Sequence, residues 1–197
     1  MAEHFESINQ MAINGLYEEV LIAGFGGQGI ILAGRLLAQT AMKAGKEVTC
    51  MPSYGAEVRG GTANCMVVIS DKPIACPLVS RPDSLIAMSK ASANKFSKSI
   101  KDSGVLVMNS SLIKEKPELP ESIEILSVPA DELALELGNI RAANMVALGA
   151  YLQKSKILGV DTAVECLPEV LAKRHHQILS VNADALRRGA QFIARGS

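Results

Sequence analysis

The sequence of 197 residues has no tryptophan, few other aromatic residues and no excess charge of either sign. Twenty basic residues balance twenty acidic residues, and there are only three tyrosines and four phenylalanines. Nucleic-acid binding usually needs a basic patch, with aromatic side chains on which bases can stack. The composition therefore argues against a nucleic-acid partner. Charged residues make up only 20% of the chain, which favours a subunit that buries part of its surface against partners.

The chain also lacks a long uninterrupted apolar run. The apolar stretch that begins at Val20 contains several glycines, Gln28 and Arg35, so it does not predict a membrane span. The N-terminus holds Glu3 and Glu6 and has no apolar core of the kind found in signal peptides. We expect a cytoplasmic protein with no membrane association. Residues 1–18 are interpreted as an N-terminal extension and residues 19–197 as one domain.

Paired cysteine motifs are absent as well. Cys50, Cys65, Cys76 and Cys166 are widely spaced, and no CxxC or CxxH sequence occurs. Without paired spacing, neither a metal site nor an iron–sulfur cluster is expected within this chain. The simplest interpretation is four small buried thiols in a reducing compartment. The sequence offers no residue that we can assign as catalytic.

What is present is an alternation of strands and helices. Strands are predicted at residues 19–24, 47–51, 62–70, 83–88, 104–109 and 123–129, and helices between Gln28 and Gly45 and at 89–101, 131–137, 142–154 and around 183–193. The first strand–helix–strand unit predicts two parallel strands joined by a right-handed connection. Thr162 and Glu165 predict a capping box, and Pro168 predicts a break between two helical pieces. The pattern is typical of a three-layer α/β/α domain, with a largely parallel or mixed central sheet and a helical C-terminal third.

A glycine-rich turn joins the first predicted strand to the first predicted helix. Gly24, Gly26 and Gly29 match the pattern GxGxxG in the context in which it binds phosphates. A dinucleotide site also needs an acidic residue at the end of the second strand, whereas Glu47 opens that strand. Another phosphate-bearing ligand and a purely structural or interface turn both remain open. The residues proposed to contact a phosphate are Gly24, Gly26, Gly27, Gln28 and Gly29.

Two motifs together resemble a known family. The motifs are "GFGGQGI" at the first turn and "PSYGAEVRGGTANCMVVIS" at residues 52–70. Together they resemble the gamma subunit of 2-oxoacid:ferredoxin oxidoreductases, and the second motif is most similar to the 2-oxoglutarate branch. The resemblance implies oxidative decarboxylation of a 2-oxoacid to an acyl-coenzyme A, with reduction of ferredoxin. It makes coenzyme A the candidate ligand of the glycine turn and implies that this chain supports assembly and the coenzyme A path. It implies alpha, beta and ferredoxin-like delta partners, which carry thiamine diphosphate, Mg²⁺ and 4Fe–4S clusters. This chain has neither a Gly-Asp-Gly thiamine signature nor cluster cysteines, so it is expected to be inactive alone.

The second motif predicts a loop that meets a ligand or a partner subunit. Its residues are Ser53, Tyr54, Glu57, Arg59, Gly60 and Gly61. The Arg59 guanidinium offers a planar fork for a carboxylate or phosphate, although a surface ion pair with Glu57 is the alternative. Asn144 is interpreted as structural. Two other functions also stay open at this point: a self-sufficient Rossmann-type oxidoreductase and a nucleotide-sensing binding module.

Overall fold

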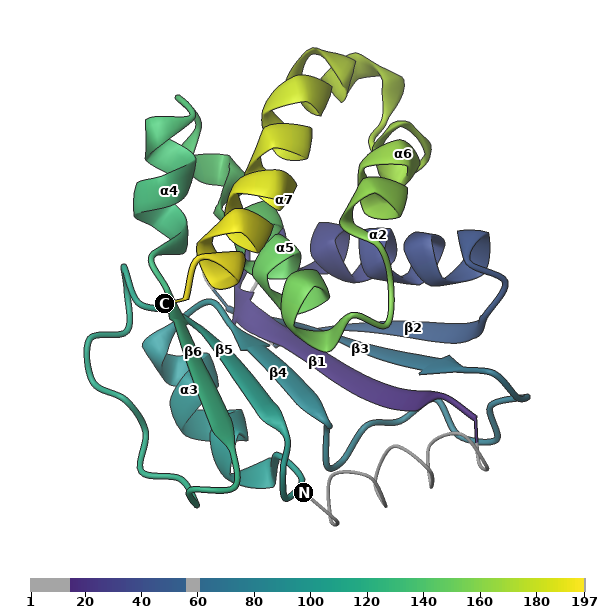
Figure 1. Ribbon diagram of the computed structural model, residues 1–197, viewed down its shortest axis with the longest axis vertical. Coiled ribbons are helices and arrows are strands. Elements are labelled where there is room, and N and C mark those ends of the chain that lie inside the picture. The colour runs from purple at the N-terminus through teal and green to yellow at the C-terminus, as the bar shows by residue number, and fades with distance from the viewer. Residues whose placement is uncertain (1–14, 56–60, 197) are drawn as a thin grey trace.

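The computed structural model describes residues 15–55 and 61–196, which form a layered α/β structure around a six-stranded mixed sheet. The strand order is β2-β3-β1-β4-β5-β6 (Figure 1). The strands are β1 (Tyr17–Phe25), β2 (Glu47–Tyr54), β3 (Thr62–Ser70), β4 (Ser84–Ala87), β5 (Val105–Asn109) and β6 (Glu124–Val128). Strands β1, β4, β5 and β6 are parallel, whereas β3 runs antiparallel to both of its neighbours, β1 and β2.

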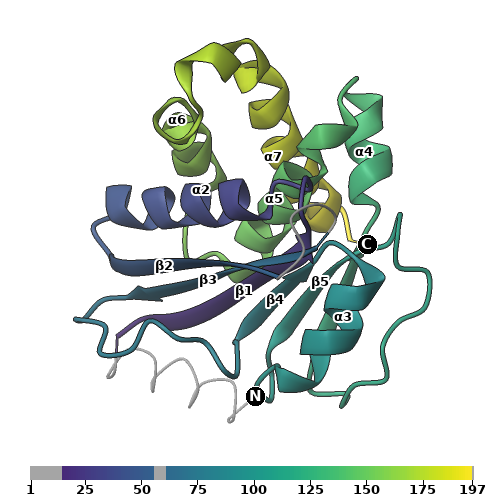
Figure 2. The same ribbon diagram turned by 180° about the vertical axis from the view of Figure 1, so that it is seen from behind.

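Helices cover the two faces of the sheet unequally. On one face lie α2 (Ile30–Lys43) and α5 (Ala143–Ser155), with α6 (Val160–Val170) and α7 (Leu179–Ala194) packed on them. On the opposite face lies α3 (Lys90–Phe96), as the two views show (Figures 1 and 2). The short α4 (Ala130–Glu136) follows β6 and packs beside α5 and α7. The predicted three-layer α/β/α class and the helical C-terminal third are confirmed.

The side chains of β1 contribute alternately to two layers of core, one on each face of the sheet. Val20 and Ile22 belong to the large core beneath α2 and α5, whereas Leu21 and Ala23 belong to the smaller core that includes Ala93 of α3. Successive side chains of a strand point to opposite faces, so a strand that is apolar at every position must be buried on both sides. The continuous apolar run of β1 therefore specifies a central strand.

Helices α5 and α7 cross with their backbones in contact. A Cβ atom added at Gly149 would overlap the carbonyl group of Leu186, and one added at Gly189 would overlap that of Val146. Glycine at both positions removes the side chains that would otherwise separate the helices. This crossing fixes α5 against the rest of the helical layer.

Three details differ from the sequence prediction or refine it. Strands β1 and β2 are parallel as predicted, but β3 lies between them in the sheet. The predicted capping box is wrong: Gly159 is the N-cap of α6 with no side-chain cap, so Thr162 already lies inside the helix. Pro168 does not break the helix where it stands, because it lies inside α6, which continues to Val170. The second helical piece is α7, which begins at Leu179.

The termini and the cysteines complete the comparison. Strand β1 begins at Tyr17, two residues earlier than the predicted strand. The expectation of four buried thiols holds for Cys65 and Cys166, but Cys50 is half-buried and Cys76 is exposed. No helix in the described ranges combines the length and apolar character needed to cross a membrane.

Candidate functional site

The two motifs singled out in the sequence meet at one edge of the sheet. Gly24, near the end of β1, pairs with Ala63 near the start of β3, and Ala63 pairs on its other side with Tyr54 at the end of β2. The Gly26 N–H donates a hydrogen bond to the Gly61 carbonyl oxygen at 2.9 Å. The glycine turn and the loop after β2 are therefore neighbours, at the edge where open α/β sheets bind ligands.

Gln28 holds the glycine turn from within. Its Oε1 atom accepts a hydrogen bond from the Phe25 N–H at 2.7 Å, and its Nε2 atom donates to the Met88 carbonyl oxygen at 2.9 Å. Met88 follows β4, so one side chain links the turn to the end of the neighbouring parallel strand. Both ends of the Gln28 amide are occupied, which makes this residue a support for the turn and leaves the contact to a ligand to the backbone.

The four glycines of the turn have different surroundings. A Cβ atom at Gly24 would lie 2.5 Å from Gln28 Oε1 and 3.0 Å from Met88 Cβ, so that position is closed by the protein itself. Gly29 has a φ of +71° and would place its Cβ against the Asn144 amide. By contrast, a Cβ at Gly27, where φ is +96°, would meet no atom of the described residues within 4 Å. Gly24 and Gly29 thus serve internal packing, whereas Gly27 has no neighbour on that side among the described residues.

Helix α2 begins directly behind this turn. Gly29 is its N-cap and supplies no side-chain cap, and the first turn of α2 contains no acidic residue. Within the part of the chain that is described, no group accepts a hydrogen bond from the N–H of Gly27, Gly29 or Ile30. Free N–H groups at the positive end of a helix dipole favour an anion. The arrangement fits a phosphate or carboxylate outside Gly27.

Asn144 supports the turn from α5. The side chain is buried, and its Nδ2 atom donates to the Gly29 carbonyl oxygen at 2.9 Å. Its Oδ1 atom has no partner among the described residues. The structural interpretation of Asn144 agrees with this contact, but nothing in the sequence indicated that residues 115 positions apart would meet.

The second motif is only partly described. Ser53 and Tyr54 are exposed at the end of β2, and the relative solvent exposure of Tyr54 is 70%. Gly61 is half-buried beside the glycine turn. Glu57, Arg59 and Gly60 lie outside the described residues, so their predicted roles stay predictions.

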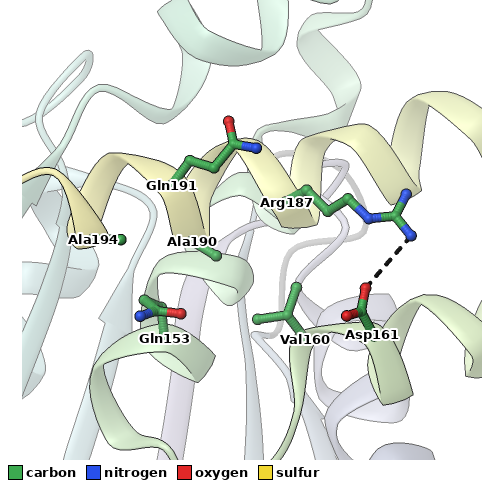
Figure 3. Close-up of a pocket in the computed structure, with 7 residues that line it drawn as sticks. All are labelled: Gln153, Val160, Asp161, Arg187, Ala190, Gln191 and Ala194. Carbon is green, nitrogen blue, oxygen red and sulfur yellow. Dashed lines mark ion pairs between the residues drawn. The ribbon is translucent and has the colours of Figure 1, made fainter.

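A separate pocket opens between the C-terminal helices. It has a volume of about 340 Å³, and Arg187 reaches Asp161 across it at 3.5 Å (Figure 3). Its other lining residues are Gln153, Val160, Ala190, Gln191 and Ala194. None of these lining residues belongs to either motif, and the exposed Arg187–Asp161 ion pair can contribute little to stability or to ligand binding.

The described residues of these two places do not form a set of metal ligands. Across residues 15–55 and 61–196, no group of three or more His, Cys, Asp or Glu side chains is arranged to hold a metal ion. The donor set of the described residues therefore does not fit an iron–sulfur cluster or a thiamine-bound Mg²⁺ ion.

Comparison with known proteins places the chain among oxidoreductase subunits. Residues 19–192 match the family Pyruvate ferredoxin/flavodoxin oxidoreductase. The 2-oxoglutarate synthase subunit KorC of Methanothermobacter thermautotrophicus is 35% identical, over 91% of this chain and 97% of KorC. The ketoisovalerate oxidoreductase subunit VorA of the same species is also 35% identical, over 88% of this chain. The chain spans only 36% of the length of VorA.

Two solved structures share the fold. The gamma subunit of a keto/oxoacid ferredoxin oxidoreductase from Geobacter sulfurreducens aligns with a TM-score of 0.75 and 29% identity, over 88% of this chain and 96% of that one. The 2-oxoglutarate:ferredoxin oxidoreductase from Magnetococcus marinus, with 2-oxoglutarate, coenzyme A and succinyl-CoA bound, aligns with a TM-score of 0.81 and 27% identity. That alignment covers 92% of this chain and 32% of the longer one.

Proposed function

We propose that this chain, which belongs to the pyruvate ferredoxin/flavodoxin oxidoreductase family, works as the gamma subunit of a 2-oxoglutarate:ferredoxin oxidoreductase. The observation that carries the proposal is the alignment with KorC along nearly the whole length of both chains. Relatives of that length are single subunits, whereas VorA contains a matching region within a longer chain. The reaction is oxidative decarboxylation of the 2-oxoacid to its acyl-coenzyme A, with electrons passed to ferredoxin.

The redox chemistry is assigned to partner subunits. Thiamine diphosphate with Mg²⁺ would supply decarboxylation, and 4Fe–4S clusters would carry the electrons. The described residues of this chain offer no fitting set of ligands for either group. We therefore assign them to alpha, beta and ferredoxin-like delta subunits in a cytoplasmic complex. The contribution of the gamma chain is assembly and binding.

The glycine turn is assigned to the coenzyme A path. Coenzyme A carries phosphate groups, and no described residue accepts from the N–H groups at the start of α2 or lies within 4 Å of a Cβ atom added at Gly27. The neighbouring Tyr54 is exposed and can pack against a partner subunit or against the adenine ring. The assignment is supported by the Magnetococcus marinus enzyme, which shares this fold over part of its length and has coenzyme A and succinyl-CoA bound.

A self-sufficient Rossmann enzyme is less consistent with the structure. In that fold the acidic residue that binds the ribose stands at the end of the strand beside β1. Here β2 is separated from β1 by β3, and it ends in Pro52, Ser53 and Tyr54. Glu47 opens β2 at the opposite edge of the sheet. A dinucleotide would therefore lack its ribose anchor.

The proposal is tested by reconstitution. The chain is expressed alone and together with alpha, beta and delta partners, and each preparation is assayed for viologen dye reduction with a panel of 2-oxoacids, coenzyme A and thiamine diphosphate. We expect no turnover by the chain alone, and coenzyme A-dependent turnover with 2-oxoglutarate by the complex. Substrate-dependent turnover by the isolated chain would refute the assignment, and a preference for another 2-oxoacid would refute the substrate.

The coenzyme A assignment needs its own pair of variants. Gly27→Ala and Gly27→Asp impose similar backbone strain, but only aspartate places a negative charge beside the proposed anion. We expect the KM for coenzyme A to rise at least about tenfold more in Gly27→Asp than in Gly27→Ala, which corresponds to about 1.4 kcal/mol of repulsion. Equal values in the two variants, or loss of assembly in both, would assign the turn to an interface.

Arg59 is tested in the same complex. If its guanidinium binds a carboxylate or phosphate through two parallel hydrogen bonds, Arg59→Lys should recover only part of the function lost in Arg59→Ala. Truncation of a buried charge pair costs roughly 2–5 kcal/mol, against at most about 1 kcal/mol for a surface pair. Subunit dissociation and the KM for coenzyme A separate the two. Near-native values in Arg59→Ala would remove Arg59 from the site.

A further inference from the structure

Two cysteines that are fifteen positions apart lie sulfur to sulfur on neighbouring strands. Cys50 of β2 and Cys65 of β3 have their Sγ atoms 3.4 Å apart, and neither forms a disulfide. Both side chains belong to the face of the sheet covered by α2, because both contribute to the core beneath that helix. The antiparallel pairing of β2 with β3 holds them in place. This proximity is a property of the fold that the sequence spacing does not indicate.

The two thiols differ in exposure and in acidity. Cys50 is half-buried and Cys65 is buried. The hydrogen bond from the Cys65 thiol lowers the pKa of Cys50 to about 7, and the Arg35 guanidinium on α2 acts in the same direction. The same hydrogen bond and burial raise the pKa of Cys65. Cys50 is therefore the more accessible sulfur and the one that is partly a thiolate near neutral pH, which is the reactive form.

We propose that Cys50 and Cys65 form a redox-sensitive dithiol site that closes to a disulfide on exposure to a low-molecular-weight disulfide. The Cys50 thiolate attacks one sulfur of the small disulfide, forms a mixed disulfide and releases the first small thiolate. Cys65 then loses its proton to water and attacks the Cys50 sulfur, which releases the second small thiolate. Two protein thiols are oxidised, one small disulfide is reduced, and two small thiols leave.

The geometry suits the second step. A disulfide bond is about 2.05 Å long, so the two sulfur atoms, which come from diagonal positions of the β2–β3 ladder, must approach by roughly 1.3 Å. Cys65 is placed to attack nothing else, since it is buried against Gly34 of α2. The reaction joins the two strands that flank the loop after Tyr54. It uses no residue of the glycine turn and does not depend on the proposed enzymatic function.

The test uses the full chain with Cys76→Ser and Cys166→Ser, so that only the pair remains. The reduced protein is incubated anaerobically with oxidised glutathione at neutral pH, and its intact mass is measured. We expect most molecules to lose the mass of two hydrogen atoms and to retain no glutathione. Combined cleavage after Lys46, after Arg59 and before Asp71 should give peptide 47–59 joined to peptide 60–70. Free thiols at both positions, or glutathione kept on Cys50, would overturn the proposal.

Two single variants separate the roles of the sulfurs. In Cys65→Ala the mixed disulfide has no resolving thiol, so Cys50 should gain the mass of one glutathionyl group and keep it. In Cys50→Ala the buried Cys65 should stay unmodified. Iodoacetamide alkylation of Cys50 should have its pH midpoint near 7 in the starting protein and at higher pH in Cys65→Ala. An unchanged midpoint would show that Cys65 does not activate Cys50, and it would overturn the assigned order of attack.

Discussion

Gly149→Ala is the substitution for which the structure gives the clearest energetic expectation. The new Cβ atom would lie 2.7 Å from the Leu186 carbonyl carbon and 2.9 Å from its Cα atom. Carbon atoms prefer separations of about 3.5–4.0 Å, so α5 and α7 must move apart by about 1 Å. Because the obstructing atoms belong to backbone, no side-chain rotation can relieve the contact. The loss of stability therefore comes from the separation of α5 and α7 along their whole interface.

Two opposing contributions set the size of the effect. Alanine in place of glycine stabilises a helix interior by about 1 kcal/mol, whereas overpacking a core costs about 1–3 kcal/mol and sometimes more. Here the strain falls on two backbones and opens the contacts between α5 and α7, so we expect the larger cost. The free energy of unfolding should fall by about 2 kcal/mol net, which lowers Tm by roughly 4–8 °C in a chain of this size.

Urea unfolding followed by circular dichroism measures the effect on the isolated chain. Gln153→Ala, on a half-buried position of the same helix, serves as the control and should change the free energy by less than about 0.5 kcal/mol. Gly189→Ala meets the Val146 carbonyl and should resemble Gly149→Ala. Once the helices have parted, the second substitution should cost less, so the double variant should lose less than the sum. Native stability in both single variants would refute the close crossing.

Three further predictions concern buried polar groups. Gly29→Ala should lower the free energy of unfolding by about 2 kcal/mol, because φ is +71° and the new Cβ would displace the Asn144 amide. The loss should be smaller in an Asn144→Ala background, and urea unfolding of the starting protein, the two single variants and the double variant measures both values. Burial raises the pKa of the Glu18 carboxyl from 4.5 to about 7, so the folded chain holds this proton more tightly than the unfolded chain. Stability relative to Glu18→Gln should therefore fall by up to about 3 kcal/mol as pH rises from 4.5 to 7, and parallel pH profiles would contradict this. The buried Asn109 side chain accepts a hydrogen bond from the Ala130 N–H and donates one to Asp131. Asn109→Ala should therefore lower the free energy of unfolding, measured by thermal unfolding, by about 3 kcal/mol. A loss below about 1 kcal/mol would show that other groups replace these hydrogen bonds.

Local patterns in the sequence were sufficient to predict the strands, the helices and the glycine turn. An apolar run of strand length, a turn of glycines and a helical stripe each follow from the preferences of neighbouring residues. The position of β3 between β1 and β2 does not follow from such preferences. The strand order depends on which strand pairs with each hydrogen-bonding edge of β1. The apolar sequence of β3 is compatible with a place beside β1 and with a place at the edge of the sheet. The capping box failed for a related reason, because α6 starts one turn earlier, behind Gly159.

At the site, the sequence indicated the two motifs, but neither that they meet nor what supports them. The structure brings Gly26 of the glycine turn against Gly61 of the second motif. The contact of Asn144 with Gly29 and the pairing of Cys50 with Cys65 are products of chain topology. Neither leaves a periodic or spacing signal, so one sequence alone could not have revealed them.

These supports connect the site to the helical layer. The start of α2 is held on one side by the Gln28 bonds to Phe25 and Met88, and on the other by Asn144, which lies one turn and a half before Gly149 on α5. A shift of α5 at its crossing with α7 would therefore move the Asn144 amide relative to Gly29. Since the Gly29 carbonyl also accepts from the Ala33 N–H, the turn keeps one of its two hydrogen bonds when Asn144 is lost. The glycine turn thus has a local support that survives such a shift and a distant one that does not, and the distant one couples its geometry to the packing of the C-terminal helices.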